Sequence, residues 1–435
     1  MPESRIVIAG GGFGGLYAAL ELEKILKRQD DISLTLLNNE NFFLFTPMLA
    51  EIASSSIGTR HIVSPLRKLL RRCRFAEVNI ENIDPVLRVV SARHSLTGAP
   101  VKFSYDRLIL ALGGVINYFN IPGAAEYSIA FKTLGDAIYV RNHVIDKLEE
   151  AAVEPERASE LLTFAIVGGG LTGLEVSGAL NDFVREALKF YPEIKREHVR
   201  VMLIEAGPRL IPEMSKELAS FSERILTKRG VEVRTKTAVT RVGPNSFELS
   251  TGERIESGTI IWSAGVSPSP LLAKLAVPKE RGRARVNEYL EVEGFEGLWA
   301  VGDSAYIFDQ ESDEPFPPTA QHAIREGKRA GRNVAASLGF GARHPFRYRT
   351  MGQLALVGER TGVADLMGHQ FSGFLAWFLW RTYYLMRVPL LEKRLRVMMD
   401  WTLDLFFERD IVQLAVSRER KLIAGKMTDL RKTGS

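Results

Sequence analysis

The 435-residue chain has a single cysteine, Cys73. One thiol excludes an intramolecular disulfide, a dithiol redox pair and a metal cluster held by several thiolates. The seven histidines show no metal-ligand spacing, so we expect no metal site. Long apolar runs are also missing, because Arg381 and Arg387 interrupt the aromatic stretch that begins at residue 371. A membrane-spanning helix needs about 20 predominantly apolar residues, and none is expected here.

The N-terminus has one basic residue, Arg5, before an apolar strand, and it lacks the apolar core and cleavage site of a secretory signal. We therefore expect the protein to stay on the cytoplasmic side of the cell membrane. The length suits two or three domains. A composition of 46% hydrophobic and 25% charged residues is typical of a globular protein with a sizeable core.

The net charge of +5 is unevenly distributed. Residues 341–435 contain 16 Lys and Arg against 9 Asp and Glu, whereas residues 1–340 contain 41 against 43. A basic tail indicates an anionic partner, either nucleic acid or a phospholipid surface. The aromatic residues of the tail cluster in one block instead of alternating with Lys and Arg, so we expect no nucleic-acid binding.

Residues 5–37 read as strand, glycine-rich turn, helix and strand. The turn holds Gly10, Gly12 and Gly15 in the spacing G-x-G-x-x-G. The first glycine permits the tight turn, the second lets the backbone approach a pyrophosphate, and the third packs helix on strand. The unit ends at Asn38, whose side-chain oxygen can accept a hydrogen bond from a ribose hydroxyl without carrying charge.

The same order recurs at residues 163–204, with Gly168, Gly170 and Gly173 in the turn. Two copies with the correct flanking elements are much stronger evidence for phosphate binding than one lone motif. The second unit ends at Glu205, whose carboxylate can accept from both ribose hydroxyls and would repel a 2′-phosphate. This strand end favours NADH over NADPH.

Three further apolar strands end in small or acidic residues that fit the ligand edge of a sheet. A helix is predicted after the third of them, with Thr319 as its N-cap. The three strand ends are Ala111 to Gly113, Ala264 to Gly265, and Gly302 to Asp303.

Together these motifs resemble the two-dinucleotide-binding flavoproteins, in which the first cradle binds FAD and the second binds NAD(P)H. Within that superfamily the chain is similar to the type II NADH dehydrogenases, the single-subunit NADH:quinone oxidoreductases. The similar segments are "FFLFTPML" at 42–49, "GGGLTGLE" at 168–175, "TAQHA" at 319–323 and the aromatic C-terminal segment. The resemblance covers roughly residues 5–410.

The resemblance implies an α/β fold with two Rossmann-like domains, the NADH domain being inserted in the FAD domain. Residues 1–120 and 289–345 are then the FAD-binding domain, residues 121–288 the NADH-binding domain, and residues 346–435 an amphipathic helical region for membrane association. Expected FAD contacts are Gly10, Gly12, Phe13, Gly14, Gly15, Asn38, Pro47, Ala111, Gly113, Gly302, Asp303, Ala320 and Gln321. Expected contacts of NADH, the co-substrate, are Gly168, Gly170, Leu171, Thr172, Gly173, Glu205, Ala264 and Gly265.

Three catalytic positions follow from the resemblance. Glu175, in the first turn of the helix after the second cradle, either complements the helix N-terminus or delivers a proton to the quinone. Gln321 donates to the flavin or the quinone. Arg325 stands where the family segment A-Q-x-x-x-Q has its second Gln, so it lies either in the quinone pocket or on the helix surface beside Arg329 and Arg332.

The C-terminal segment predicts one or two helices lying on a surface. Leu391, Leu395, Met398, Thr402 and Leu405 follow the spacing of one helix face. A membrane surface fits, because the quinone resides in the bilayer and a basic, aromatic amphipathic segment binds at the headgroup boundary. Packing into the core or into a homodimer interface is the alternative.

The sequence thus predicts a peripheral respiratory-chain flavoprotein that passes electrons from NADH to a quinone. Two other activities fit the same fold: an NADH-dependent flavin reductase for a soluble carrier protein, and a non-catalytic NADH-sensing flavoprotein. Sulfide:quinone oxidoreductases and disulfide reductases need a cysteine pair and are excluded.

Overall fold

The computed structural model describes residues 4–309 and 313–413 of the chain. The chain divides into two compact units, each assembled from segments that are distant in sequence. The three-part division expected from the resemblance stays a prediction. Of the described residues, the first unit comprises 4–45, 63–117, 266–309 and 313–351, and the second comprises 46–62, 118–265 and 352–413.

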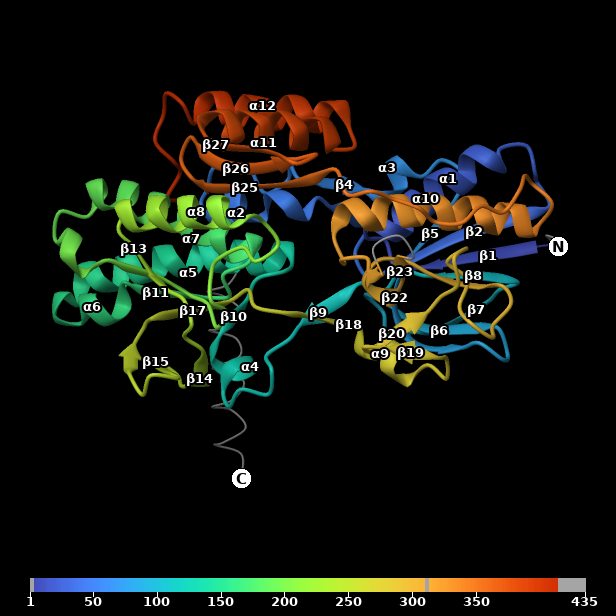
Figure 1. Cartoon of the computed structure of the whole chain (residues 1–435), viewed down its shortest axis with the longest axis horizontal. Helices are drawn as coiled ribbons and strands as arrows, with labels where there is room; N and C mark the ends of the chain where they lie inside the picture. The colour runs from blue at the N-terminus through green and yellow to red at the C-terminus, as the bar shows by residue number, and fades with distance from the viewer. Residues whose placement is uncertain (1–3, 310–312, 414–435) are drawn as a thin grey trace. The chain divides into compact units, whose positions relative to one another are not determined.

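The first unit is built on a seven-stranded sheet (Figure 1). The strands from β21 to β5 pair in parallel, whereas β6 and β7 extend the sheet in antiparallel fashion. Residues 6–9 are buried on both faces, as expected for a central parallel strand covered by helices. In spatial order the strands are β21 (Leu298–Ala300), β8 (Arg107–Leu110), β1 (Ser4–Ala9), β2 (Ile32–Asn38), β5 (Arg74–Asp84), β6 (Val89–His94) and β7 (Pro100–Ser104).

Two helices of the first unit, α1 (Phe13–Ile25) and α10 (Ala320–Ser337), lie side by side (Figure 1). A Cβ at Gly327 would lie only 2.1 Å from the carbonyl oxygen of Gly14, so the missing side chain lets the two backbones touch. Thr319 is the N-cap of α10, which confirms the helix start predicted from the sequence.

The second unit contains a five-stranded parallel sheet that repeats the strand, turn and helix order of the first. The strands are, in spatial order, β10 (Ile129–Ala130), β17 (Thr259–Trp262), β11 (Thr163–Val167), β12 (Arg200–Ile204) and β13 (Val231–Arg234). Its longer helices are α5 (Leu134–Val153), α7 (Leu171–Ala187) and α8 (Lys216–Lys228).

The C-terminal part of the second unit starts with a sheet that the sequence did not predict. It has three antiparallel strands, β25 (Gly352–Gly358), β26 (Thr361–Leu366) and β27 (His369–Gly373). The expected helices follow as α11 (Phe374–Arg387) and α12 (Leu391–Leu403). Among the described residues, no helix has the length and apolar character needed to cross a bilayer.

Short elements complete both units. In the first these are β3 (Phe42–Leu44), β4 (Val63–Pro65), α3 (Leu66–Leu69), β9 (Gly114–Ile116), β18 (Val266–Pro268), α9 (Pro270–Lys274), β19 (Lys279–Glu280), β20 (Arg283–Arg285), β22 (Ala305–Tyr306), β23 (Phe308–Asp309) and β24 (Glu314–Pro315). In the second they are α2 (Leu49–Ala53), α4 (Ala124–Tyr127), α6 (Ala158–Leu161), β14 (Val239–Val242), β15 (Ser246–Leu249) and β16 (Arg254–Glu256).

Candidate functional site

The first glycine turn connects β1 to α1 as predicted. Gly10 has a φ of +113°, and a Cβ there would lie 2.1 Å from the oxygen of Ala111, so only glycine lets the ends of β1 and β8 approach. Gly12 is the N-cap of α1, and no side chain caps the helix there. A Cβ on Gly12 would meet nothing within 4 Å. The N-terminus of α1 is therefore free of a side-chain cap and has open space beside Gly12, which fits a pyrophosphate.

The second turn has the same construction in the second unit. Gly168 has a φ of +108° and packs against the end of β17, while a Cβ on Gly173 would lie 1.8 Å from the oxygen of Gly168. Gly170 caps α7 without a side-chain hydrogen bond, and the nearest atom to a Cβ there is 3.8 Å away. This turn also fits a pyrophosphate. The other residues expected to contact NADH lie at this edge: Leu171, Thr172, Ala264 and Gly265.

The strand-end residues hold the turns themselves. Asn38 Oδ1 accepts a hydrogen bond from Gly11 N at 2.9 Å. Glu205 accepts from Gly169 N at 2.6 Å and from Gly207 N at 2.5 Å. The sequence indicated only a ribose contact for these two side chains, because a backbone partner 27 or 36 residues away leaves no local pattern.

The remaining residues expected to bind FAD are divided between the units. Pro47 belongs to the second unit, in the 3-10 turn Thr46–Met48. In the first unit, the hydrogen bond from Leu112 N to Ser304 Oγ, 2.9 Å long, joins the residues that follow β8 and β21. The others of the first unit are Phe13, Gly14 and Gly15 at the start of α1, Ala111 and Gly113 after β8, Gly302 and Asp303 after β21, and Ala320 and Gln321 at the start of α10.

Glu326 supports the turn that carries Asp303. Its carboxylate accepts from Gly302 N at 2.6 Å, and only 3% of the residue is exposed. Burial raises the pKa of Glu326 to about 7, the hydrogen bond from Gly302 lowers it, and the charge of Asp303 raises it. Sequence analysis did not predict this role, because Glu326 lies in a helical stretch where nothing distinguishes it from an ordinary helix glutamate.

Gln321 and Arg325 lie together on one face of α10, against Tyr348. The hydroxyl of Tyr348 donates to Gln321 Oε1 at 2.9 Å, and the guanidinium of Arg325 stacks 4.2 Å from the centre of the Tyr348 ring. Arg325 also donates to the carbonyl oxygen of Gln321 at 2.8 Å. Two of the three expected catalytic residues are therefore neighbours in the first unit, while Glu175 lies in the second.

Glu175 extends from α7 toward the C-terminal segment. Its Oε1 accepts from Leu356 N at 3.1 Å and from Trp380 Nε1 at 3.0 Å. Burial raises the pKa of Glu175 to about 8, outweighing these two hydrogen bonds, and the nearby charge of Glu51 raises it further. Glu175 therefore keeps a proton at neutral pH, which a general acid requires.

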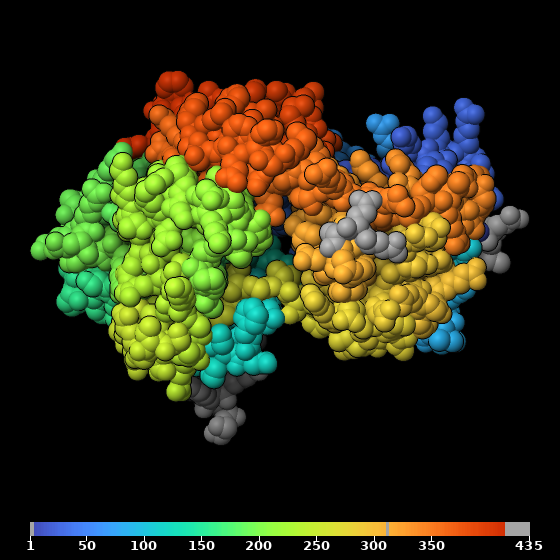
Figure 2. Space-filling model, in the orientation of Figure 1, coloured from blue at the N-terminus to red at the C-terminus, as the bar shows by residue number. Residues whose placement is uncertain are grey.

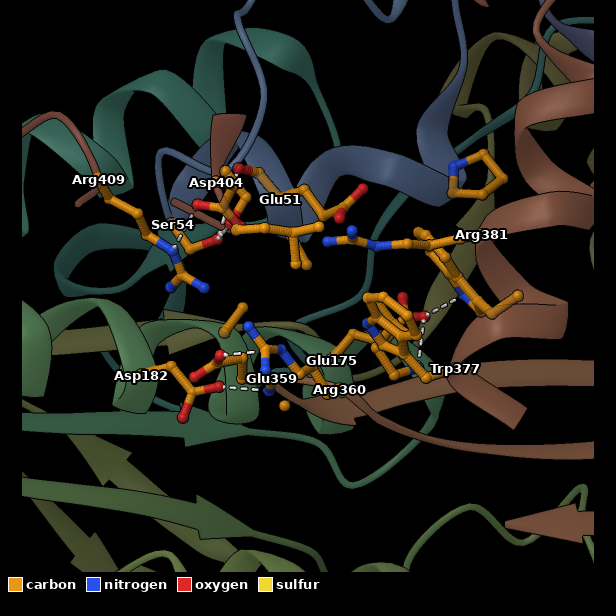
Figure 3. Close-up of a pocket in the computed structure, with 18 residues that line it drawn as sticks. Glu51, Ser54, Glu175, Asp182, Glu359, Arg360, Trp377, Arg381, Asp404 and Arg409 are labelled. Carbon is orange, nitrogen blue, oxygen red and sulfur yellow. Dashed lines mark hydrogen bonds and ion pairs between the residues drawn. The ribbon is translucent and has the colours of Figure 1, made fainter. Parts of the chain in front are cut away.

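Glu175 lines a cavity that lies wholly within the second unit (Figure 3). Its walls come from α2, α7, β25, α11 and the segment after α12. Trp377 and Trp380 supply the apolar part of the wall, and Glu51, Arg381 and Arg409 bring charge into it. The sequence did not predict this cavity, because its walls come from segments that are far apart in the chain.

Comparisons with known families match nearly the whole chain. Residues 4–327 match the pyridine nucleotide-disulphide oxidoreductase family, and residues 351–410 match the NDH2 C-terminal domain. The chain is 33% identical to the type II NADH:quinone oxidoreductase Ndh of Mycobacterium tuberculosis, over 93% of this chain and 89% of that protein. It is 29% identical to a probable NADH dehydrogenase of Dictyostelium discoideum, over 94% and 90% of the two chains.

The solved structure of NDH2 from Plasmodium falciparum in complex with NADH has the same fold. Its TM-score is 0.86, over 94% of this chain and 100% of that chain, at 21% sequence identity. This match confirms the α/β dinucleotide-binding fold predicted from the sequence. By its sequence identity over most of its length and by both family matches, the chain belongs to the type II NADH:quinone oxidoreductases, within the pyridine nucleotide-disulphide oxidoreductase family.

Proposed function

We propose that this chain oxidises NADH and reduces a membrane quinone without pumping protons, using FAD. The observation that carries this is the pair of equivalent glycine cradles, one in each unit, that both fit a dinucleotide pyrophosphate. Bound FAD would supply the redox chemistry that links hydride removal from NADH to two-electron reduction of the quinone. A disulfide is excluded as the electron acceptor within the chain, because Cys73 has no second cysteine to pair with.

The first cradle holds FAD and the second holds NADH in this proposal. The turns at Gly10–Gly15 and Gly168–Gly173 bind the two pyrophosphates through backbone amides. The charge of Glu205, which supports the second turn, disfavours the 2′-phosphate of NADPH. NADH is a substrate that comes and goes, whereas the many expected contacts of the first cradle suit a resident cofactor.

The start of α10 stabilises the negative charge that develops when the cofactor and quinone are reduced. A helix N-terminus favours an anion by roughly 0.3–1 kcal/mol at the surface and by up to about 2 kcal/mol when partly buried. Gln321 offers its side-chain amide as a donor there, and Tyr348 holds its oxygen. Arg325, fixed on the Tyr348 ring, adds a cation beside it.

Glu175 supplies a proton. Conversion of a quinone into a quinol consumes two electrons and two protons. NADH brings the electron pair and one proton as a hydride, so the second proton has to come from solvent through the protein. Glu175, with a pKa of about 8, is a carboxyl group that is still protonated at neutral pH and can release its proton.

The C-terminal helices place the protein on the phospholipid surface. On α12, Val397 and Trp401 point inward, while Leu391, Leu395 and Met399 are exposed. Figure 2 shows α11 and α12 at the outer surface of the second unit. Several exposed apolar side chains on one helix are typical of an interface with a membrane or with another protein. We assign them to the cytoplasmic face of the cell membrane, where the quinone is dissolved.

The proposal is tested by purifying the protein, recording its flavin spectrum and assaying it with NADH and NADPH. We expect bound FAD, a strong preference for NADH, and turnover with short-chain quinones of the ubiquinone or menaquinone type. Reduction of a soluble iron–sulfur carrier without any quinone reduction would assign the chain to the flavin reductases. Binding of NADH without turnover would make it a sensor.

A further inference from the structure

Glu51, on α2, is a buried carboxylate that the reaction described above does not use. Only 4% of the residue is exposed, and its Oε1 accepts a hydrogen bond from Trp401 Nε1 at 3.0 Å. Its other oxygen, Oε2, is buried and has no hydrogen-bond partner among residues 4–309 and 313–413. An unpaired buried carboxylate oxygen is costly, so it calls for a proton, a water molecule or both.

Glu51 and Glu175 line the same cavity in the second unit (Figure 3). About 50 Å³ of this cavity is open to the centres of water molecules. One water molecule needs roughly 10–15 Å³ of such volume, so the cavity has room for a short chain of waters between polar groups. Carboxyl groups at its walls give those waters the hydrogen-bond partners that they need.

Glu51 and Glu175 have different charged neighbours, which affect their pKa values differently. Arg381 and Arg409 attract the Glu51 carboxylate, and Asp404 repels it. In Figure 3 the side chains of Glu51 and Arg381 point toward one another. On its side of the cavity, Glu175 faces the charge of Glu51 and interacts with the buried hydroxyl of Tyr384.

Two of the cations have unused donors at the cavity. Arg381 Nε and Arg409 Nη1 are buried and lack partners in the described part of the chain. Arg381 is held by stacking between Trp377 and Trp401, at 4.3 and 4.7 Å from the ring centres. These fixed donors can orient water molecules toward the carboxyl groups.

Burial raises the pKa of Glu51 to about 7, and that of Glu175 to about 8. The two values are close to each other and to neutral pH, so a proton can pass between the groups at little free-energy difference. Because ionised Glu51 raises the pKa of Glu175, the two carboxyl groups titrate as a coupled pair.

We propose that Glu51 is a proton-relay residue that reloads Glu175 through water in this cavity. The inference rests on the proposed function, in which Glu175 gives its proton to the quinone. Glu175 becomes a carboxylate when it releases that proton. Neutral Glu51 then passes its own proton to Glu175 through the waters, becomes a carboxylate itself, and takes a new proton from solvent. One proton enters from solvent for each quinone reduced, which balances the reaction.

An infrared titration of the purified flavoprotein, with no substrate present, tests the pair directly. From about pH 5 to about pH 10, and beside the band of Glu326, whose pKa is also raised to about 7, the wild type should show two carboxylic acid carbonyl bands, from Glu51 and Glu175, that disappear as the groups ionise. Glu51→Gln should remove the Glu51 band. It should also displace the midpoint of the Glu175 band to lower pH, because the charge that raised the pKa of Glu175 is gone. Gln can still accept from Trp401, so the fold should be retained.

The matched control is Glu256→Gln, since Glu256 of the same unit is exposed and pairs with Arg254 at the surface, outside this cavity. It should leave both bands and both midpoints in place. If Glu51→Gln leaves both bands, Glu51 carries no proton. If the midpoint of the Glu175 band does not move in this variant, the titrations of Glu51 and Glu175 are not coupled. Either result overturns the relay.

Kinetics at about pH 6, where both carboxyl groups are protonated, separate the two proposals. Glu51→Gln should form the first quinol at the wild-type rate and then slow at least about tenfold, because reloading fails. Glu175→Gln should slow the first quinol as well, by about 10²-fold or more. Flavin reduction by NADH should be unchanged in both variants.

The outcomes are distinguishable. Wild-type turnover of Glu175→Gln would remove Glu175 from the proposed function, and the relay would fall with it. A slow Glu175→Gln together with a Glu51→Gln variant that keeps wild-type steady-state turnover would overturn the relay alone.

Discussion

Asn38 serves the first cradle with both ends of its side-chain amide. Oδ1 accepts from Gly11 N at 2.9 Å, and Nδ2 donates to the carbonyl oxygen of Glu40 at 2.8 Å. A carboxylate here would keep the first interaction but would repel the Glu40 oxygen. Dinucleotide-binding units usually carry an acidic residue at this strand end, and the Asn found here has a local reason in the backbone that follows β2.

Replacing Asn38 with Ala should loosen the first cradle. The change leaves Gly11 N without its partner, and an unsatisfied buried donor costs about 1–3 kcal/mol. We expect a lower melting temperature and a lower FAD content after gel filtration, measured by calorimetry and by flavin absorbance. The neighbouring exposed Asn39→Ala is the control and should match the wild type. Full flavin retention by Asn38→Ala would show that this bond does not shape the site.

The role of a residue could be predicted from the sequence only where its hydrogen-bond partner is close in the chain or where the residue belongs to a recognised motif. The glycines of both turns and the N-cap Thr319 were found, because spacing alone identifies them. Glu51 was not, since the Trp401 that buries it is 350 positions away. Glu326 was missed for the same reason, as its partner Gly302 lies on another element. The ligand roles of the expected site residues stay predictions.

At the scale of elements, α7 and β25 form the contact that fixes Glu175. A Cβ on Gly178 of α7 would lie 2.5 Å from the oxygen of Val357, next to the Leu356 amide that donates to Glu175. The sequence predicted α7 but not β25, because the glycine-interrupted segment 352–373 shows only a short alternation of apolar residues. Its strands are defined mainly by the helices that they pack against.

Gly178→Ala should therefore disturb both stability and proton delivery. The added methyl group forces α7 and β25 apart, and overpacking of this kind costs about 1–3 kcal/mol. We expect a lower melting temperature and slower quinone reduction, with flavin reduction by NADH retained. Gly135→Ala on α5 is the control, because a Cβ there meets only Thr133 Oγ1 at 3.6 Å. Equal melting temperatures for both variants would contradict the close packing.

At the scale of the whole molecule, each unit completes its own cradle. In the first unit the ends of β8 and β21 adjoin the turn after β1, and in the second the end of β17 adjoins the turn after β11. The repeated unit was predictable from the sequence because the glycine spacing and the flanking strands recur. The assignment of residues 46–62 and 352–413 to the second unit was not, since it depends on contacts between distant segments.

The proposed membrane association belongs to the scale of the whole molecule, and under that proposal the α12 face should control it. Leu391 and Leu395 are 69% and 51% exposed, and burying a leucine in an apolar phase gains about 1.5–3 kcal/mol. Leu391→Glu with Leu395→Glu should weaken binding to anionic phospholipid vesicles by about 100-fold or more, measured by co-sedimentation. The control, Leu87→Glu with Leu96→Glu, makes the same charge change at leucines that are 73% and 84% exposed, and it should bind like the wild type. If the α12 variant keeps its vesicle binding but changes its sedimentation coefficient in solution, this face is a homodimer interface instead.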